Sequence, residues 1–257
     1  HTKVMVFPEL CITGYTCQDL FLQRRLLDSA WETLMRIAAD TADVDALIFL
    51  GVPVRNKGKL YNAAAVLNRG EILGLVPKSY LPNYGEFYEQ RHFVSGLGCL
   101  EFMSINGKKI PFGTNLLFVC EELQELIVAA EICEDLWVNM PPSVIHAQAG
   151  ANLIVNLSAS NEMVGKDSYR RSLVSGQSAR LVCGYVYANA GEGESTQDLV
   201  FGGQNMIAEN GSILAEGERF KNGIVYSEID VQRLNDERKR LTTWQSCEDS
   251  DHLRIPF

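Results

Sequence analysis

The feature of this chain that most restricts its fold is a series of short apolar runs, several of them rich in β-branched residues. Runs that are apolar throughout, instead of at alternate positions, are typical of strands buried on both faces. We therefore predict strands at Val4–Phe7, Ala46–Val54, Leu116–Val119, Leu126–Ala130, Leu153–Leu157, Gly184–Asn189 and Ile224–Ile229.

Helical patterns and hairpin turns lie between these runs. Apolar residues at helical spacing predict helices at Leu20–Thr41, Val144–Ala149 and Lys166–Arg180. Turn residues predict two hairpins, in which Tyr61–Leu67 pairs with Glu71–Pro77 and Gly203–Ala208 pairs with Ser212–Glu216. The mixture indicates an α/β fold with one mixed-sheet domain over residues 1–235, and the polar segment 236–257 resembles a linker or arm.

Composition excludes several function classes. The formal charge of −9 gives no electrostatic reason to expect nucleic acid or an anionic membrane as a partner. No apolar stretch reaches the length of a membrane span. Seven cysteines without C-x-x-C spacing and four scattered histidines argue against a disulfide framework or a metal cluster, and they favour a reducing, cytoplasmic location. Neither a glycine-rich dinucleotide fingerprint nor a phosphate loop is complete.

Three reactive side chains stand at the ends of predicted strands. Glu9 follows Val4-Met5-Val6-Phe7-Pro8, Lys78 follows Ile72-Leu73-Gly74-Leu75-Val76-Pro77, and Cys133 follows the run Leu126 to Ala130. Hydrolysis of an amide through a thioester needs a nucleophilic thiol, a base that takes its proton, and donors that stabilise the oxyanion. Glu9 suits the base, Lys78 the cation and Cys133 the nucleophile, with the backbone N–H of Glu134 as a second oxyanion donor.

The segments around these residues resemble the three signature blocks of the nitrilase (carbon–nitrogen hydrolase) superfamily. The blocks are Phe7-Pro8-Glu9-Leu10-Cys11-Ile12-Thr13-Gly14-Tyr15, Pro77-Lys78-Ser79-Tyr80-Leu81-Pro82 and Glu131-Ile132-Cys133-Glu134-Asp135-Leu136-Trp137. The chain is most similar to the glutaminase domains of glutamine-dependent NAD synthetases, through Asp19-Leu20, residues 83–93 (NYGEFYEQRHF) and Asn156-Leu157-Ser158-Ala159-Ser160. The resemblance extends from Val4 to about Glu237.

The resemblance implies a fold and a set of site residues. The fold is a four-layer α-β-β-α sandwich, which commonly forms dimers or larger homo-oligomers. The implied catalytic residues are Glu9, Lys78 and Cys133, together with Glu86, which would orient the lysine and the substrate end of the site. The implied substrate-binding residues are Tyr15, Phe87, Glu134, Ser160 and Lys166, with no metal ligand among them.

The implied reaction is hydrolysis of L-glutamine to glutamate and ammonia, without a cofactor in this half of the enzyme. The ammonia would serve NAD synthesis from nicotinic acid adenine dinucleotide, in a synthetase domain that uses ATP and Mg²⁺. That domain, in the same or a partner chain, and the strand that opens the family fold are both absent from this sequence. Its start, His1-Thr2-Lys3, suggests a fragment of a longer protein.

Two alternatives stay open. The chain could be a free-standing amidase of the same superfamily that acts on another ω-amide or a carbamoyl compound. It could also be a non-catalytic domain that binds a partner or completes an oligomer. A carboxylate at Glu134 and a hydroxyl at Ser160 suit the zwitterionic end of glutamine better than a neutral substrate.

Overall fold

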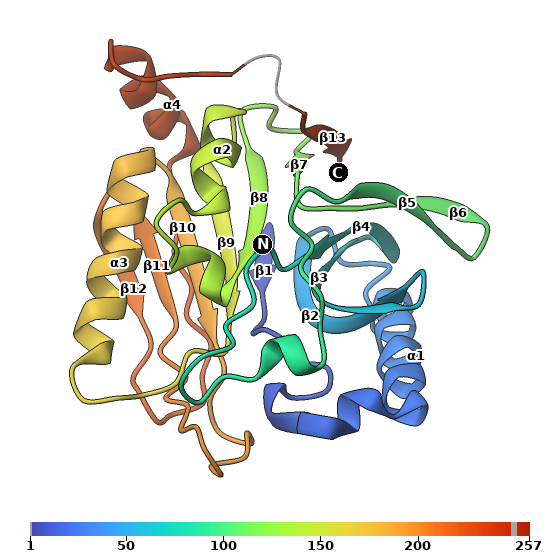
Figure 1. Ribbon diagram of the computed structural model, residues 1–257. Coiled ribbons are helices and arrows are strands. Elements are labelled where there is room, and N and C mark those ends of the chain that lie inside the picture. The colour runs from blue at the N-terminus through green and yellow to red at the C-terminus, as the bar shows by residue number, and fades with distance from the viewer. Residues whose placement is uncertain (1, 248–250) are drawn as a thin grey trace.

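Two β-sheets lie face to face and are covered by helices on their outer sides (Figure 1). The computed structural model describes residues 2–247 and 251–257. One sheet has six strands in the order β1-β2-β3-β4-β6-β5, and the other has seven in the order β12-β11-β10-β9-β8-β7-β13. The predicted four-layer sandwich is confirmed.

The first sheet is built from the N-terminal part of the chain. Its strands are β1 (Val4–Val6), β2 (Leu47–Asn56), β3 (Lys59–Asn68), β4 (Glu71–Pro77), β5 (Leu100–Ile105) and β6 (Lys108–Gly113). β2, β3 and β4 pair antiparallel, whereas β1 pairs parallel to β2. The predicted β3–β4 hairpin is confirmed, and the β5–β6 hairpin was not predicted.

The second sheet has a parallel centre. Its strands are β7 (Leu116–Val119), β8 (Ile127–Ile132), β9 (Leu153–Ser158), β10 (Gly184–Asn189), β11 (Met206–Glu209), β12 (Ser212–Glu216) and β13 (Leu253–Pro256). β8, β9 and β10 run parallel, so their carboxyl ends meet at one edge of the sheet. The elements that follow β8 and β9 carry much of the site described below.

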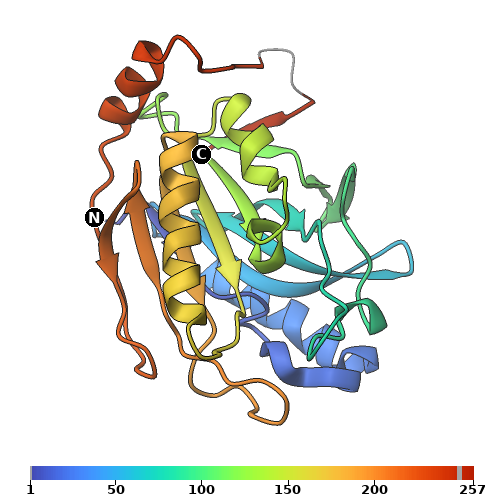
Figure 2. The ribbon, with the colours of Figure 1, turned by 60° about the vertical axis from the view of Figure 1, so that its left-hand side comes forward.

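Helices cover both outer faces, as the rotated view shows (Figure 2). The α-helices are α1 (Arg24–Asp40), α2 (Pro142–Gln148), α3 (Lys166–Leu181) and α4 (Val231–Arg240), and short 3₁₀ helices are η1 (Tyr15–Leu22), η2 (Glu89–Arg91) and η3 (Cys133–Leu136). The predicted helix Leu20–Thr41 is therefore divided, because the chain leaves helical geometry at Gln23.

Alternation along β2 explains the layers. Leu47 and Phe49 belong to the core between the sheets, whereas Ile48 and Leu50 face α1. A third core lies between the second sheet and helices α2 and α3, around Val174 and Tyr185. Because both faces of β2 are buried from Leu47 to Val54, its sequence is apolar over that stretch.

Two predictions about the C-terminal part are wrong. Residues 224–229 form no strand, and the side chain of Ile224 is 92% exposed and that of Tyr226 83% exposed. The segment after Asn235 is not a loose linker, because α4 crosses that boundary and buried Arg238 donates to the carbonyl of Ala151 (2.8 Å). β13 also pairs with β7, whereas residues 248–250 lie outside the described part. The loss of an opening strand, and a link from this segment to a synthetase domain, stay predictions.

Candidate active site

Glu9 is held in a tight turn that follows β1. Its side chain is 1% exposed, and Oε2 accepts a hydrogen bond from the N–H of Ala159 (2.9 Å). The turn lies directly on Gly51 of β2, where a Cβ atom would stand 2.1 Å from the backbone nitrogen of Leu10. Only glycine leaves room for this approach, so the position of Glu9 depends on Gly51.

Lys78 is the first residue after β4 and its side chain is fully buried. Its Nζ atom lies 2.7 Å from Oε1 of Glu9 and 2.6 Å from Oε1 of Glu89. Burial disfavours the charged ammonium, but the two carboxylates outweigh burial and hold the pKa of Lys78 well above its usual value. Lys78 is therefore a permanent cation, which can stabilise an oxyanion but cannot act as a base.

Cys133 stands at the turn between β8 and η3. Its φ of +45° is unusual for a residue other than glycine, and strain of this kind is concentrated at functional sites. Burial raises the pKa of the thiol above its ordinary range; the charges of Glu9 and Glu89 raise it further, while Lys78 and the N–H of Ala159 lower it. The thiol is protonated at neutral pH, so it needs a base.

Asp135 ties the cysteine turn to the lysine segment. Its carboxylate accepts hydrogen bonds from the N–H groups of Ile132 (2.9 Å), Tyr80 (2.8 Å) and Ser79 (3.4 Å). One buried side chain therefore joins the residue before the nucleophile to the two residues after Lys78.

The expectation that Glu86 orients the lysine is wrong, because Glu89 occupies that place. Glu86 instead accepts a hydrogen bond from Asn161 Nδ2 (2.5 Å). The one-turn helix η2 directs Glu89 inward and sends Arg91 outward to the exposed carboxylate of Asp19. Sequence reasoning did not assign Glu89 to the site. Its position eleven residues after Lys78 was the available signal.

The residues expected to bind substrate surround this centre. The hydroxyl of Tyr15 donates to Oε1 of Glu89 (2.8 Å), and Glu134 accepts from the hydroxyl of Tyr84 (2.6 Å), which sequence reasoning did not single out. Burial raises the pKa of Tyr15 well above its ordinary value, so this hydroxyl stays a donor. The roles of Tyr15 and Glu134 toward a substrate stay predictions.

Lys166 opens α3 and stands between aromatic rings. Its Nζ atom lies 5.1 Å from the ring centre of Trp137 and 5.8 Å from that of Phe87, and it donates to Oδ1 of Asn161. Desolvation lowers its pKa. The structure therefore brings Lys166 and Phe87 together as one wall, with Asn161 as the link to Glu86.

Ser160 lies deeper than expected for a residue that binds substrate through its hydroxyl. Its Oγ accepts from the guanidinium of Arg170 (3.3 and 3.4 Å), whose side chain is completely buried. Arg170 also donates to the carbonyl of Asn161 (2.8 Å) and to Glu162 (2.7 Å). This arginine holds the segment after β9 in place.

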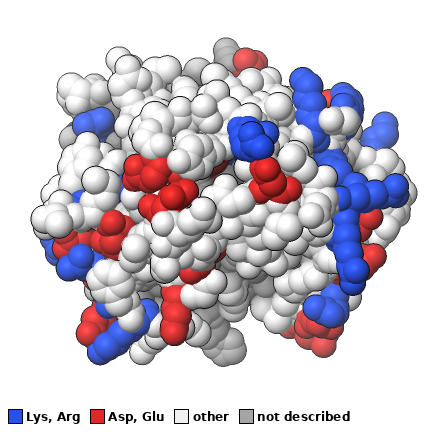
Figure 3. Space-filling model, turned by 60° about the horizontal axis from the view of Figure 1, so that its bottom comes forward, with Lys and Arg blue, Asp and Glu red and all other residues white. Residues whose placement is uncertain are grey.

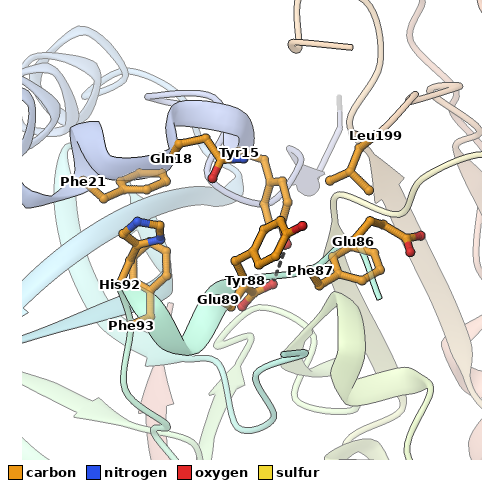
Figure 4. A pocket seen from close by; sticks show the side chains of 10 residues that line it. All are labelled: Tyr15, Gln18, Phe21, Glu86, Phe87, Tyr88, Glu89, His92, Phe93 and Leu199. Carbon is orange, nitrogen blue, oxygen red and sulfur yellow. Dashed lines mark hydrogen bonds between the residues drawn. The ribbon is translucent and has the colours of Figure 1, made fainter. Parts of the chain in front are cut away.

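A small pocket opens beside Glu89 (Figure 4). Its lining includes Tyr15, Glu86, Phe87, Glu89 and Leu199. On the face shown in Figure 3, acidic and basic side chains lie against one another in several places on a largely uncharged surface. Within the described residues, no group of three or more His, Cys, Asp or Glu side chains is arranged to hold a metal ion. No helix of that part is long and apolar enough to cross a bilayer.

Comparisons with known proteins agree on one family. A carbon–nitrogen hydrolase family model matches residues 1–239. The chain is 46% identical over 241 residues to a glutamine-dependent NAD(+) synthetase of Mycobacterium tuberculosis, which covers 93% of this chain and 36% of that protein. The corresponding protein of Thermotoga maritima is 32% identical, over 95% of this chain and 40% of its own length. The chain thus spans well under half of these relatives.

Solved structures show the same relationship. The glutamine-dependent NAD(+) synthetase of Cytophaga hutchinsonii superimposes with a TM-score of 0.77 at 34% identity, covering 87% of this chain and 36% of that one. The nitrilase-superfamily amidase of Nesterenkonia AN1 superimposes with a TM-score of 0.66 at 21% identity, over 93% of this chain and 83% of the amidase, and shows the shared fold. From the family match, the sequence identity and the two-sheet architecture together, the chain belongs to the carbon–nitrogen hydrolase family.

Proposed function

We propose that the chain is a glutaminase domain, which hydrolyses L-glutamine and supplies ammonia for ATP-dependent NAD synthesis. The observation that carries the proposal is the buried arrangement of Glu9, Lys78 and Cys133, joined by the short contact between Glu9 and Lys78. The 46% identity to a glutamine-dependent NAD(+) synthetase supports glutamine as the substrate.

The reaction begins with proton transfer. Glu9 takes the proton of the Cys133 thiol as the sulfur attacks the carboxamide carbon of glutamine, which forms a C–S bond and a tetrahedral oxyanion. The cation of Lys78 stabilises the oxyanion. The N–H of Glu134 adds a second donor, because the first N–H groups of a helical turn have no partner within the helix.

The intermediate then collapses and the C–N bond breaks. Glu9 returns its proton to the leaving nitrogen, ammonia departs, and a γ-glutamyl thioester remains on Cys133. Glu9 next takes a proton from water, whose oxygen attacks the thioester carbon. The C–S bond breaks, glutamate leaves, and the proton returns to the thiol. No step requires a metal or an organic cofactor.

The wider setting of the reaction is part of the same proposal. A synthetase domain, in this chain or a partner chain, would use the ammonia, with ATP and Mg²⁺, to amidate nicotinic acid adenine dinucleotide. The names of the relatives and the 36% share of their length that this chain spans support such a partner. We place the enzyme in the cytoplasm as a homo-oligomer.

A substrate panel and covalent labelling test the proposal. The chain should release ammonia from L-glutamine faster than from neutral amides such as propionamide. The electrophilic analogue 6-diazo-5-oxo-norleucine should add its mass at Cys133, and glutamine should protect against it. C133A should lose both signals, whereas C247S, which changes an exposed cysteine, should keep them.

Two results would contradict this function. A preference for a neutral amide would indicate an amidase with another substrate. Failure of the wild-type chain to hydrolyse any amide, together with unlabelled Cys133, would indicate a non-catalytic binding domain.

A further inference from the structure

A chain of buried hydrogen bonds starts at the backbone of the nucleophile and leads away from the pocket into the helical layer. The N–H of Cys133 donates to Oδ1 of Asn156 (3.2 Å), and Nδ2 of Asn156 donates to the hydroxyl of Tyr185 (3.1 Å). The Tyr185 hydroxyl donates in turn to Oε1 of Glu131, two residues before the nucleophile on the same strand.

This chain of hydrogen bonds is also held at its far end, at Glu131. Oε2 of Glu131 accepts from the N–H of Ser143 at the start of α2 (2.9 Å), and Gln177 of α3 donates to the Ser143 hydroxyl (3.0 Å). The side chains of Glu131, Asn156 and Tyr185 are at most 1% exposed. Water therefore has no access through which it could replace a lost partner.

These groups have a fixed direction of donation. Burial raises the pKa of Glu131, but hydrogen bonds from Tyr185 and Ser143 oppose that shift and favour the carboxylate. A carboxylate only accepts hydrogen bonds, so the hydroxyl of Tyr185 is the donor in this pair. The tyrosine oxygen then accepts from the amide nitrogen of Asn156. Because Asn156 cannot turn without losing this bond, its oxygen faces the N–H of Cys133. The hydroxyl of Ser158 supports the same orientation by donating to that oxygen (2.7 Å).

We propose that Glu131 is a positioning residue, which holds the strained turn of Cys133 by fixing the direction of the chain through Tyr185 and Asn156. The N–H of Cys133 is kept on the inner side, at a backbone φ of +45°. The thiol and the following N–H, that of Glu134, are then left for the substrate. This inference deepens the proposed amide hydrolysis and rests on it.

Replacement of Glu131 by glutamine tests the direction of donation along these hydrogen bonds, and not only whether they are present. In E131Q the amide oxygen is needed by the N–H of Ser143, so the NH₂ group faces Tyr185. The tyrosine must then donate toward Asn156, whose amide turns over and sets its NH₂ against the N–H of Cys133. Two donors then face each other, and the turn loses its support.

Y185F removes the hydroxyl that links Asn156 to Glu131, and so interrupts the hydrogen bonds without reversing their direction. Y187F is the matched control. The hydroxyl of Tyr187 is also buried on β10 but takes no part in the hydrogen bonds that join Cys133, Asn156, Tyr185 and Glu131. We expect kcat for glutamine to fall about 100-fold in E131Q and about tenfold in Y185F, with KM changed less than about twofold. Y187F should keep kcat within about twofold of the wild type.

The measurements separate positioning from stability. Kinetics are taken on folded protein at a temperature well below each melting transition, and the rate of 6-diazo-5-oxo-norleucine addition at Cys133 is followed by mass spectrometry. If Glu131 is a positioning residue, the labelling rate should be highest in the wild type, lower in Y185F and lowest in E131Q. Equal kcat in the wild type and E131Q would overturn the inference, as would an equal loss in Y187F and Y185F. If E131Q does not fold, a wild-type kcat in Y185F overturns it.

Failure of the proposed function gives a different result. In that case the wild-type chain itself neither hydrolyses glutamine nor takes up the label. An active wild type with unaffected variants leaves the glutaminase proposal standing and removes only the role of Glu131.

Discussion

The ammonium of Lys78 lies 2.6 Å from Oε1 of Glu89, and both side chains are almost fully removed from solvent. Burial raises the pKa of Glu89, and Lys78 and the Tyr15 hydroxyl oppose that shift by favouring the carboxylate. Glu89 and Glu9 therefore share one cation. This pairing fixes the direction of the ammonium, while the other oxygen of Glu9 accepts from the N–H of Ala159.

We expect E89Q to lower kcat for glutamine about 100-fold, because Lys78 loses the partner that fixes its direction. The free energy of unfolding should also fall, by about 3 kcal/mol, as in other broken buried ion pairs. Steady-state kinetics and urea denaturation measure the two effects. E86Q is the comparison and should act mainly on KM, since Glu86 contacts Asn161 and not the lysine. A larger loss of kcat in E86Q than in E89Q would restore the role first expected for Glu86.

The raised pKa of the Cys133 thiol predicts slow alkylation of the resting enzyme. Because the thiolate is the reactive form, labelling of Cys133 by iodoacetamide should increase about tenfold per pH unit from pH 7 to pH 9. Peptide mass spectrometry measures this rate, with exposed Cys247 as the internal reference for reagent quality. Rapid labelling of Cys133 at pH 6, without a rise at higher pH, would show a thiolate already present at rest.

Gly51 gives a prediction about the turn that carries Glu9. In G51A the new methyl group would overlap the backbone at Pro8 and Leu10, at 2.5 and 2.1 Å, so the turn must shift or the strand must distort. We expect a loss of several kcal/mol in stability and a large loss of activity. G176A in α3 is the matched control, because its Cβ meets nothing within 4 Å. It should keep activity and gain up to about 1 kcal/mol from helix propensity, and equal effects of the two changes would refute the argument.

The buried histidine His146 predicts how stability depends on pH. Nδ1 of His146 lies 2.8 Å from Nε2 of His252, and burial lowers the pKa of His146 to about 3 from an ordinary 6.5. The unfolded chain therefore binds a proton between these values that the folded chain does not. The contribution of His146 to the free energy of unfolding should be fully present above pH 6.5. Below that pH it should decrease by about 1.4 kcal/mol per pH unit.

Urea denaturation at pH 7.5, 6.0 and 5.0 measures this slope. H146Q should reduce the slope by about the contribution of one proton, even if it lowers stability at every pH. An unchanged slope in H146Q would assign the acid sensitivity of the fold to other groups.

The sequence by itself predicted most of the strands and the three principal residues of the candidate site, and the family resemblance of the segments around those residues implied the four layers. Apolar strands and the contexts of Glu9, Lys78 and Cys133 are local patterns, and strand ends in packed sheets meet at one edge, so their proximity could be anticipated. The β5–β6 hairpin was not predicted, because the exposed positions of β5 weaken its apolar pattern. Segment 224–229 is apolar enough for a strand, but the structure gives it no partner.

Only the tertiary structure decided which glutamate contacts Lys78 and what holds the cysteine turn. Glu86 and Glu89 stand three residues apart in an irregular segment, and a single helical turn directs one of them inward. The link from Glu131 through Tyr185 and Asn156 joins strands that are far apart in sequence. Its direction follows from which groups donate and which accept, and that is fixed only when the side chains are buried together.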